Sequence, residues 1–100
     1  MLVQQNRLAL LHTFEVTASH LSFTRAAEDL HLTQGAVSHR IRHLEELLGF
    51  RLFIRMTRKL ALTQEGERLL ATLSRSLRQI SDEIEDIREQ DLRGLLHIGI

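Results

Sequence analysis

Apolar residues recur every three or four positions through the first half of the chain, which is the spacing of one face of an α-helix. The first such run predicts a helix that ends near Ser19 and His20. Its predicted apolar face consists of Leu8, Leu11, Phe14 and Ala18. Ser22 is a residue type that caps helix N-termini, so a short second helix is predicted to follow it. The apolar residues of that helix are Phe23, Ala26, Ala27 and Leu30.

A third helix is predicted between Thr33 as its N-cap and Gly49 as its C-terminal stop. Its apolar positions lie four, three and four residues apart: Val37, Ile41, Leu44 and Leu48. Only residues 31 and 32 separate the second and third helices, and the small side chains of Ala26 and Ala27 allow two helices to approach closely. This arrangement is typical of a helix-turn-helix, at about residues 23–42. A plain helical hairpin with alanines in its core is the alternative.

Two short apolar segments of β character follow, at residues 51–55 and 60–62, on either side of the basic tetrapeptide Met56-Thr57-Arg58-Lys59. They predict a two-stranded hairpin over about residues 52–62. A basic hairpin directly after a candidate recognition helix is typical of a wing. An ordinary solvated loop is the alternative, but the preceding helices favour the wing. We therefore predict a mostly α fold in which residues 1–63 form a winged helix-turn-helix of three helices and a two-stranded β wing.

The next segment has the pattern of a long helix that pairs with another helix. Thr63 is a suitable N-cap, and the apolar residues that follow are spaced alternately three and four apart, as in a heptad seam. They are Leu70, Leu73, Leu77, Ile80, Ile84 and Ile87. Docking of this stripe on the chain's own core is the alternative. The helix, however, extends beyond what a small domain can cover, and its other faces are polar. Residues 64–90 are therefore predicted to form a linker helix that mediates homodimerisation.

The last ten residues are predicted to leave the helix. Gly94 is expected to break it, and Leu96, Ile98 and Ile100 alternate as residues in a β-strand do. One strand has no sheet to join in this chain. We expect residues 91–100 to be a hinge and the first strand of a domain that is absent here.

Charge is distributed unevenly although the formal net charge is +0. Residues 31–62 contain six basic and two acidic residues, a net charge of +4. Residues 63–100 contain five basic and eight acidic residues, a net charge of −3. A basic segment confined to the predicted recognition helix and wing is expected if only that part meets a polyanion.

Composition excludes several other classes of protein. The chain has no cysteine, so it can form neither a disulfide framework nor a thiolate metal site. It has no nucleophile–base set, phosphate-binding glycine loop or metalloprotease motif, so we do not expect an enzyme. His39 and His43 are spaced as paired helix ligands are, but no third ligand converges on them, and no metal site is predicted. With no signal peptide or membrane span in the sequence, the expected location is cytoplasmic, at the nucleoid.

Several motifs resemble the LysR family of transcriptional regulators in order and spacing, over about residues 8–95. They are Phe23-Thr24-Arg25-Ala26-Ala27-Glu28-Asp29-Leu30, Leu32-Thr33-Gln34-Gly35-Ala36-Val37-Ser38-His39-Arg40-Ile41, Leu44-Glu45, Leu48-Gly49, Leu52-Phe53, Arg55, Leu62-Thr63 and Gly66. Within that family, His12-Thr13-Phe14-Glu15-Val16, Ala36-Val37-Ser38-His39-Arg40-Ile41 and Ile84-Glu85-Asp86-Ile87 look most similar to the D-serine deaminase activator branch.

The resemblance implies a sequence-specific regulator that binds double-stranded DNA as a homodimer or tetramer. It also implies a linker helix that pairs antiparallel with its partner, and a C-terminal domain, absent here, that binds a small-molecule effector. No cofactor is expected in this chain itself. Contact with RNA polymerase is a further expectation.

Burial of the apolar face of the third helix leaves a second face for the major groove of DNA. The predicted base contacts on it are Gln34, Gly35, Ser38, His39 and Arg42. Gln34 suits an adenine edge, whereas His39 or Arg42 can donate to guanine or to phosphate. Thr33, Arg58 and Lys59 are the predicted backbone contacts, and Arg55 is predicted to enter the minor groove from the wing.

A helical protein-interaction module, with no sequence-specific binding to DNA, is the alternative function. In that case the heptad helix would carry the function and the basic hairpin would bind an acidic partner. The dependence of DNA affinity on salt separates the two hypotheses, because neutralised phosphates give a steep salt slope.

Overall fold

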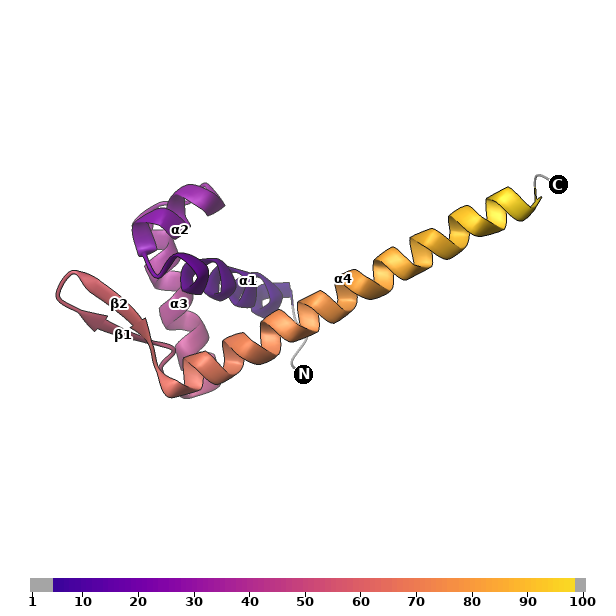
Figure 1. The fold of residues 1–100 in the computed structure, drawn as a ribbon. Helices are drawn as coiled ribbons and strands as arrows, with labels where there is room; N and C mark the ends of the chain where they lie inside the picture. Colours follow the sequence, from indigo (N-terminus) through magenta and orange to yellow (C-terminus); the bar gives the residue numbers. More distant parts are fainter. Residues whose placement is uncertain (1–4, 99–100) are drawn as a thin grey trace. The chain divides into compact units, whose positions relative to one another are not determined.

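The computed structural model describes the backbone of residues 5–98 and the side chains of residues 7–90. The elements follow in the order α1 (Gln5–His20), α2 (Phe23–Leu30), α3 (Gln34–Leu48), β1 (Phe53–Met56), β2 (Lys59–Leu62) and α4 (Gln64–Ile98) (Figure 1). Contacts between residues divide the chain into two units, residues 1–70 and residues 71–100. Three helices with a two-stranded antiparallel hairpin confirm the predicted mostly α, winged helix-turn-helix fold.

The predicted caps set the helix boundaries. The hydroxyl of Ser22 accepts a hydrogen bond from the Arg25 amide at 3.2 Å, and the hydroxyl of Thr33 accepts one from the Ala36 amide at 3.1 Å. Each bond satisfies an amide that has no partner within its own helix. Gly49 ends α3 with φ +84°, in the left-handed region that glycine enters without steric strain.

The core of residues 1–70 lies where α1, α2 and α3 pack together against the base of the hairpin. It is formed by Leu10, Phe14, Ala18, Ala26, Ala27, Val37, Ile41, Leu44, Leu52 and Phe53. Ala26 and Ala27 are buried in α2, as expected for close packing of the helix-turn-helix. Leu48 is only half-buried, although its predicted companions on α3 are fully buried.

The predicted face of α1 is partly wrong. Leu8 is 55% exposed, whereas Leu10, Thr13 and Thr17 are buried. The two threonines can be buried because each hydroxyl donates to a backbone carbonyl one turn earlier in α1 (2.9 and 2.7 Å). The buried face of α1 is therefore partly polar in sequence, and a pattern of apolar residues alone places it incorrectly.

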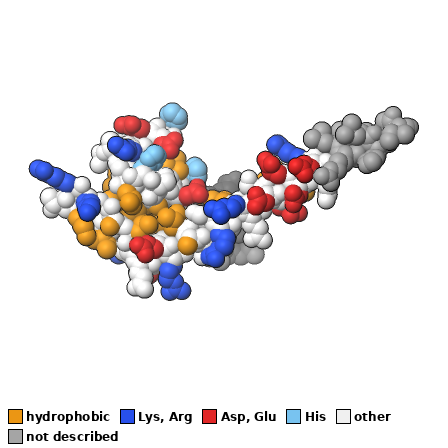
Figure 2. Space-filling view, in the orientation of Figure 1, with side chains coloured by type: hydrophobic (Ala, Val, Ile, Leu, Met, Phe, Trp, Pro, Cys, Tyr) orange, Lys and Arg blue, Asp and Glu red, His pale blue; other side chains and the backbone are white. Residues whose placement is uncertain are grey.

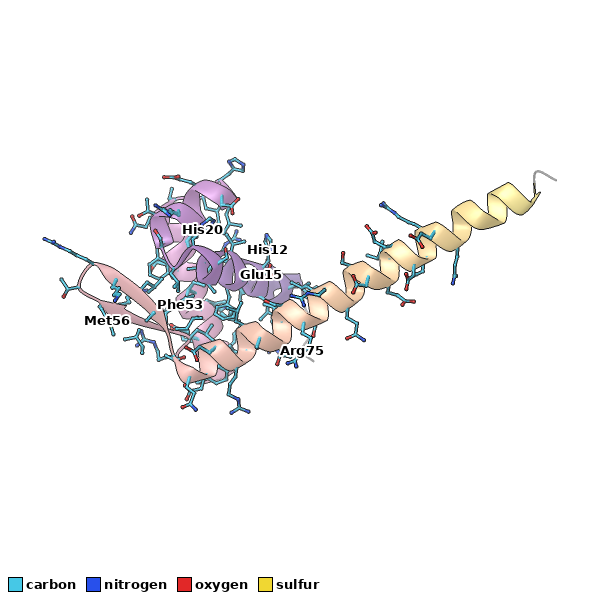
Figure 3. The ribbon with its side chains drawn as sticks, in the orientation of Figure 1. His12, Glu15, His20, Phe53, Met56 and Arg75 are labelled. Atoms are coloured by element: carbon cyan, nitrogen blue, oxygen red, sulfur yellow. The ribbon has the colours of Figure 1, made fainter. Side chains whose placement is uncertain are left out.

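The hairpin pairs Phe53 with Leu62 at its base and Met56 with Lys59 at its tip. Phe53 lies at the end of the hairpin nearest the helices, and Met56 lies toward its tip (Figure 3). The Phe53 ring makes edge-to-face contacts with Phe14 of α1 at 5.6 Å and Phe23 of α2 at 6.1 Å between centroids. These contacts anchor the base of the wing to the helices.

The prediction that the chain leaves the helix after residue 90 is wrong for residues 91–98, because α4 continues to Ile98. A glycine inside a helix costs only about 1 kcal/mol, which the neighbouring helix-forming residues can offset. A strand, in contrast, requires a partner strand for its backbone hydrogen bonds. The part of the predicted strand at Ile100 lies outside the described residues. No helix in the described part of the chain has an apolar stretch long enough to cross a bilayer.

Candidate nucleic-acid interface

The outward face of α3 carries the predicted base-contacting residues. Gln34, Gly35, His39 and Arg42 are exposed, and Ser38 is half-buried. The opposite face of the same helix is sealed against the core by residues that are at most 2% exposed, namely Val37, Ile41 and Leu44. The helix can therefore present its polar face to a ligand without disturbing its packing.

Thr33 stands at the start of this face and is exposed. Its hydroxyl oxygen is occupied as an acceptor by the Ala36 amide at 3.1 Å. The amides of the first turn of α3 point out of the helix N-terminus, where the helix dipole favours an anion. The end of α3 thus has the donors and the polarity that the predicted phosphate contact needs.

Arg55 of β1 is held against the helices. Its Nη2 donates a hydrogen bond to the Ser38 hydroxyl at 3.0 Å, and its Cζ lies 4.8 Å from the centroid of the Phe23 ring. A guanidinium over an aromatic face makes a cation–π contact. The structure thereby brings together two residues that were predicted to contact different grooves of DNA. It adds Phe23, which the sequence identified only as an apolar residue of the second helix.

The tip of the hairpin is basic. Arg58 and Lys59 are both exposed, and Arg58 adopts φ +65° at the turn. Lys and Arg side chains stand out at the far end of the hairpin (Figure 2). Together with the polar face of α3, the tip forms a surface to which a polyanion can be attracted.

Glu45 joins α3 to the wing, a role that sequence reasoning missed. One of its carboxylate oxygens accepts hydrogen bonds from the amides of Leu52 at 2.7 Å and Phe53 at 3.3 Å, and from Nε of Arg51 at 3.3 Å. The residue is only 9% exposed. A glutamate beside the apolar position Leu44 was the available signal, but its partners lie on the next element of the chain.

Thr63 and Gly66 fix the other end of the wing. The Thr63 hydroxyl donates to the Arg51 carbonyl at 2.7 Å and accepts from the Gly66 amide at 2.9 Å. The Thr63 amide donates to the Leu52 carbonyl, also at 2.9 Å. A side chain on Gly66 would collide with that same carbonyl group, so a glycine is required here.

The predicted dimerisation residues of α4 remain largely open to solvent. Leu77, Ile80, Ile84 and Ile87 are between 42% and 56% exposed, while Leu70 and Leu73 are half-buried. Four large apolar side chains at heptad spacing on one helix leave a stripe that a second helix can cover. Among the described residues, no group of three or more His, Cys, Asp or Glu side chains is placed to hold a metal ion.

Three packed helices followed by a two-stranded wing define a winged helix-turn-helix protein. The sequence profile of the family described as "Bacterial regulatory helix-turn-helix protein, lysR family" matches residues 8–67. The chain therefore belongs to the LysR family, as the motifs indicated.

Curated relatives agree with this assignment. The chain is 52% identical over 90 residues to the HTH-type transcriptional regulator DsdC of Escherichia coli K12, and the alignment covers 90% of this chain and 29% of that protein. It is 47% identical over 98 residues to the HTH-type transcriptional activator AmpR of Providencia stuartii, and the alignment covers 96% of this chain and 34% of that protein. The first of these relatives supports the resemblance to the D-serine deaminase activator branch. The chain thus spans about a third of the length of these relatives.

Solved structures show the same fold. A complex of the BenM DBD with catB site 1 DNA aligns with a TM-score of 0.73 at 29% identity, over 82% of this chain and 91% of that chain. Oxidized Corynebacterium glutamicum OxyR aligns with a TM-score of 0.69 at 33% identity, over 81% of this chain and 25% of that chain.

Proposed function

We propose that this chain is the DNA-binding and dimerising part of a transcriptional regulator that recognises a specific double-stranded site. The observation that carries the proposal is the joint surface of α3 and the wing, where an exposed polar helix face lies beside a basic hairpin. Its relatives carry the names of transcriptional regulators and activators, and one structural neighbour is a complex with DNA. An enzymatic activity is not part of the proposal.

In this proposal the N-terminal half of α3 enters the major groove. Gln34 and Ser38 bond to base edges, and His39 or Arg42 donates to guanine or to phosphate. Gly35 lets the helix approach closely, and Thr33 with the first-turn amides holds a phosphate oxygen.

The wing lies in the neighbouring minor groove. Arg55 enters that groove after exchanging its bond to Ser38 for contacts with DNA, while Arg58 and Lys59 hold phosphates. A narrow, A/T-rich minor groove gives a cation the largest gain, so this type of sequence is expected under the wing.

Two copies joined through the apolar stripe of α4 require an inverted repeat with a fixed spacing of half-sites. In the full protein we expect a dimer or tetramer in the cytoplasm, at the nucleoid, with a small-molecule effector bound by a further domain. Contact with RNA polymerase at the promoter belongs to the same proposal.

The test is binding of the 100-residue chain to two duplexes, one with a T-rich inverted repeat and one scrambled, across a series of salt concentrations. With about four to six phosphates neutralised per module, log affinity is expected to fall with log salt at about −0.9 per contact. Ser38→Ala and Arg55→Ala should each weaken site-selective binding by about 1 to 3 kcal/mol.

A chain that dimerises but binds neither duplex, even at low salt, contradicts the proposal and leaves the protein-interaction module as the better account. If the chain binds both duplexes equally, the guessed repeat is wrong, and binding sites should next be selected from DNA of random sequence. If that selection returns no enriched site, the specificity is absent.

A further inference from the structure

A hollow of about 600 Å³ opens between the C-terminal half of α3 and the base of the wing. Arg42 and Glu46 line it from α3. Arg51, just before β1, and Arg55, within β1, line it from the other side. Arg42 and Arg55 already have proposed contacts with DNA, whereas Glu46 and Arg51 have no role toward DNA and the hollow itself has no assigned ligand.

The hollow continues the outward face of α3. Positions 35, 38 and 42 lie on that face, and the helical period brings positions 45, 46 and 49 next along it. Residues 42, 45, 46 and 49 all line the hollow. Near Ser38 the space between α3 and β1 is closed, because Nη2 of Arg55 donates to the Ser38 hydroxyl at 3.0 Å. The open space between helix and wing therefore lies toward the C-terminal end of α3.

The proposed binding mode places α3 in the major groove and the wing in the adjacent minor groove. In duplex DNA these two grooves are separated by one sugar–phosphate strand. That strand must therefore pass between helix and wing, where the hollow lies.

We infer that the hollow holds a phosphodiester strand of duplex DNA, with Arg42 and Arg51 donating to phosphate oxygens from opposite walls. This inference rests on the proposed function and extends it, because it adds Arg51 as a backbone contact and assigns Arg42 to phosphate. Arg51 is able to do this, since its side chain is 65% exposed and its bond to Glu45 uses only Nε of a guanidinium with five N–H donors.

Two carboxylates also line the hollow, and they differ in what they can do. Glu45 is already bonded to two amides and Arg51, so its charge is partly offset. Glu46 is exposed. A phosphate in the hollow would be repelled by Glu46, so removal of this one negative charge should strengthen binding. A surface that meets no phosphate would show no such gain.

The experiment measures the affinity of the 100-residue chain for the inverted-repeat duplex and for a random-sequence duplex, across the same salt series. The variants are Arg42→Gln, Arg51→Gln and Glu46→Gln. Matched controls are Arg78→Gln and Glu85→Gln, which change the same charges at exposed positions of α4. Thermal unfolding of each variant checks the fold.

A phosphate contact is independent of sequence, so both duplexes should respond alike. Each arginine variant should lose roughly tenfold in affinity near 0.1 M salt, and its salt slope should fall by about 0.9. Glu46→Gln should bind about threefold more tightly at that salt concentration. Arg51→Lys, which keeps the charge, should retain the parent's salt slope.

The inference is overturned if the parent binds its site selectively while the hollow variants behave as the α4 controls do. It is also overturned if they change the ratio between the two duplexes without changing the salt slope, because they would then contact bases. Failure of the parent to bind either duplex is a different result, since it removes the proposed function and this inference with it.

Discussion

Glu45 offers a direct test of how the wing is attached to the recognition helix. In Glu45→Ala, the amides of Leu52 and Phe53 lose their acceptor. Leu52 is 0% exposed and Phe53 is 2% exposed, so water cannot readily replace the carboxylate. A buried amide left without a partner costs about 1 to 3 kcal/mol, and the 2.7 Å bond to Leu52 should lie at the upper end.

The third partner adds little. The Arg51 side chain is 65% exposed, and an ion pair of this kind contributes at most about 1 kcal/mol. We therefore expect Glu45→Ala to lower the free energy of unfolding by about 3 kcal/mol, a large share of the 5 to 15 kcal/mol typical of a domain. Glu45→Gln keeps one acceptor oxygen without its charge and should lose about 1 kcal/mol.

The assay is urea unfolding followed by far-ultraviolet circular dichroism. Protomer concentration must be held fixed, because dimerisation adds to the apparent stability. Glu46→Ala is the matched control, since Glu46 is the exposed neighbour and should change stability by less than about 0.5 kcal/mol. A loss in Glu45→Ala no larger than that in Glu46→Ala would refute the reasoning.

Two further predictions concern backbone packing and assembly. Gly66→Ala should destabilise the chain by about 2 kcal/mol in the same urea assay, because the added Cβ meets the Leu52 carbonyl. Gly35→Ala is the control, since its Cβ lies in open space and should stabilise the helix by up to about 1 kcal/mol. Equal effects of the two substitutions would contradict the role of Gly66. Ile84→Asp, on the exposed stripe of α4, should raise the dimer dissociation constant about a hundredfold in sedimentation equilibrium, because each dimer then carries two such charges in its apolar seam. Gln79→Asp, at an exposed heptad position away from the stripe, is the control, and an equal effect there would exclude the stripe as the interface.

Local chemistry explains which parts of the fold the sequence predicts well. Ser22 and Thr33 bond to amides three residues ahead, and Gly49 needs only its own backbone freedom. Such interactions depend on a few neighbouring residues, so residue types at fixed spacing are enough to place them. The boundaries of α2 and α3 followed from them.

The errors have equally specific causes. The buried face of α1 was misplaced because Thr13 and Thr17 satisfy their hydroxyls within the helix and therefore behave as core residues. The strand after residue 91 was predicted from an alternation that a helix also tolerates. Glu45 was missed because its partners lie seven and eight residues away, on an element whose position depends on the whole fold.

The position of Arg55 shows what geometry adds to the proposed function. The bond from Arg55 to Ser38 is exposed to solvent, so this bond and the cation–π contact are each worth only about 1 kcal/mol, and Arg55 can leave Ser38 at small cost. A long side chain that is already restricted loses less entropy when it binds. Phe23 is half-buried, and its ring contacts both the Arg55 guanidinium and the buried Phe53 ring. It thus links the core that holds the wing to the residue that the wing presents. The same contact keeps Arg55 at the boundary between helix and wing, where the phosphodiester strand is inferred to pass.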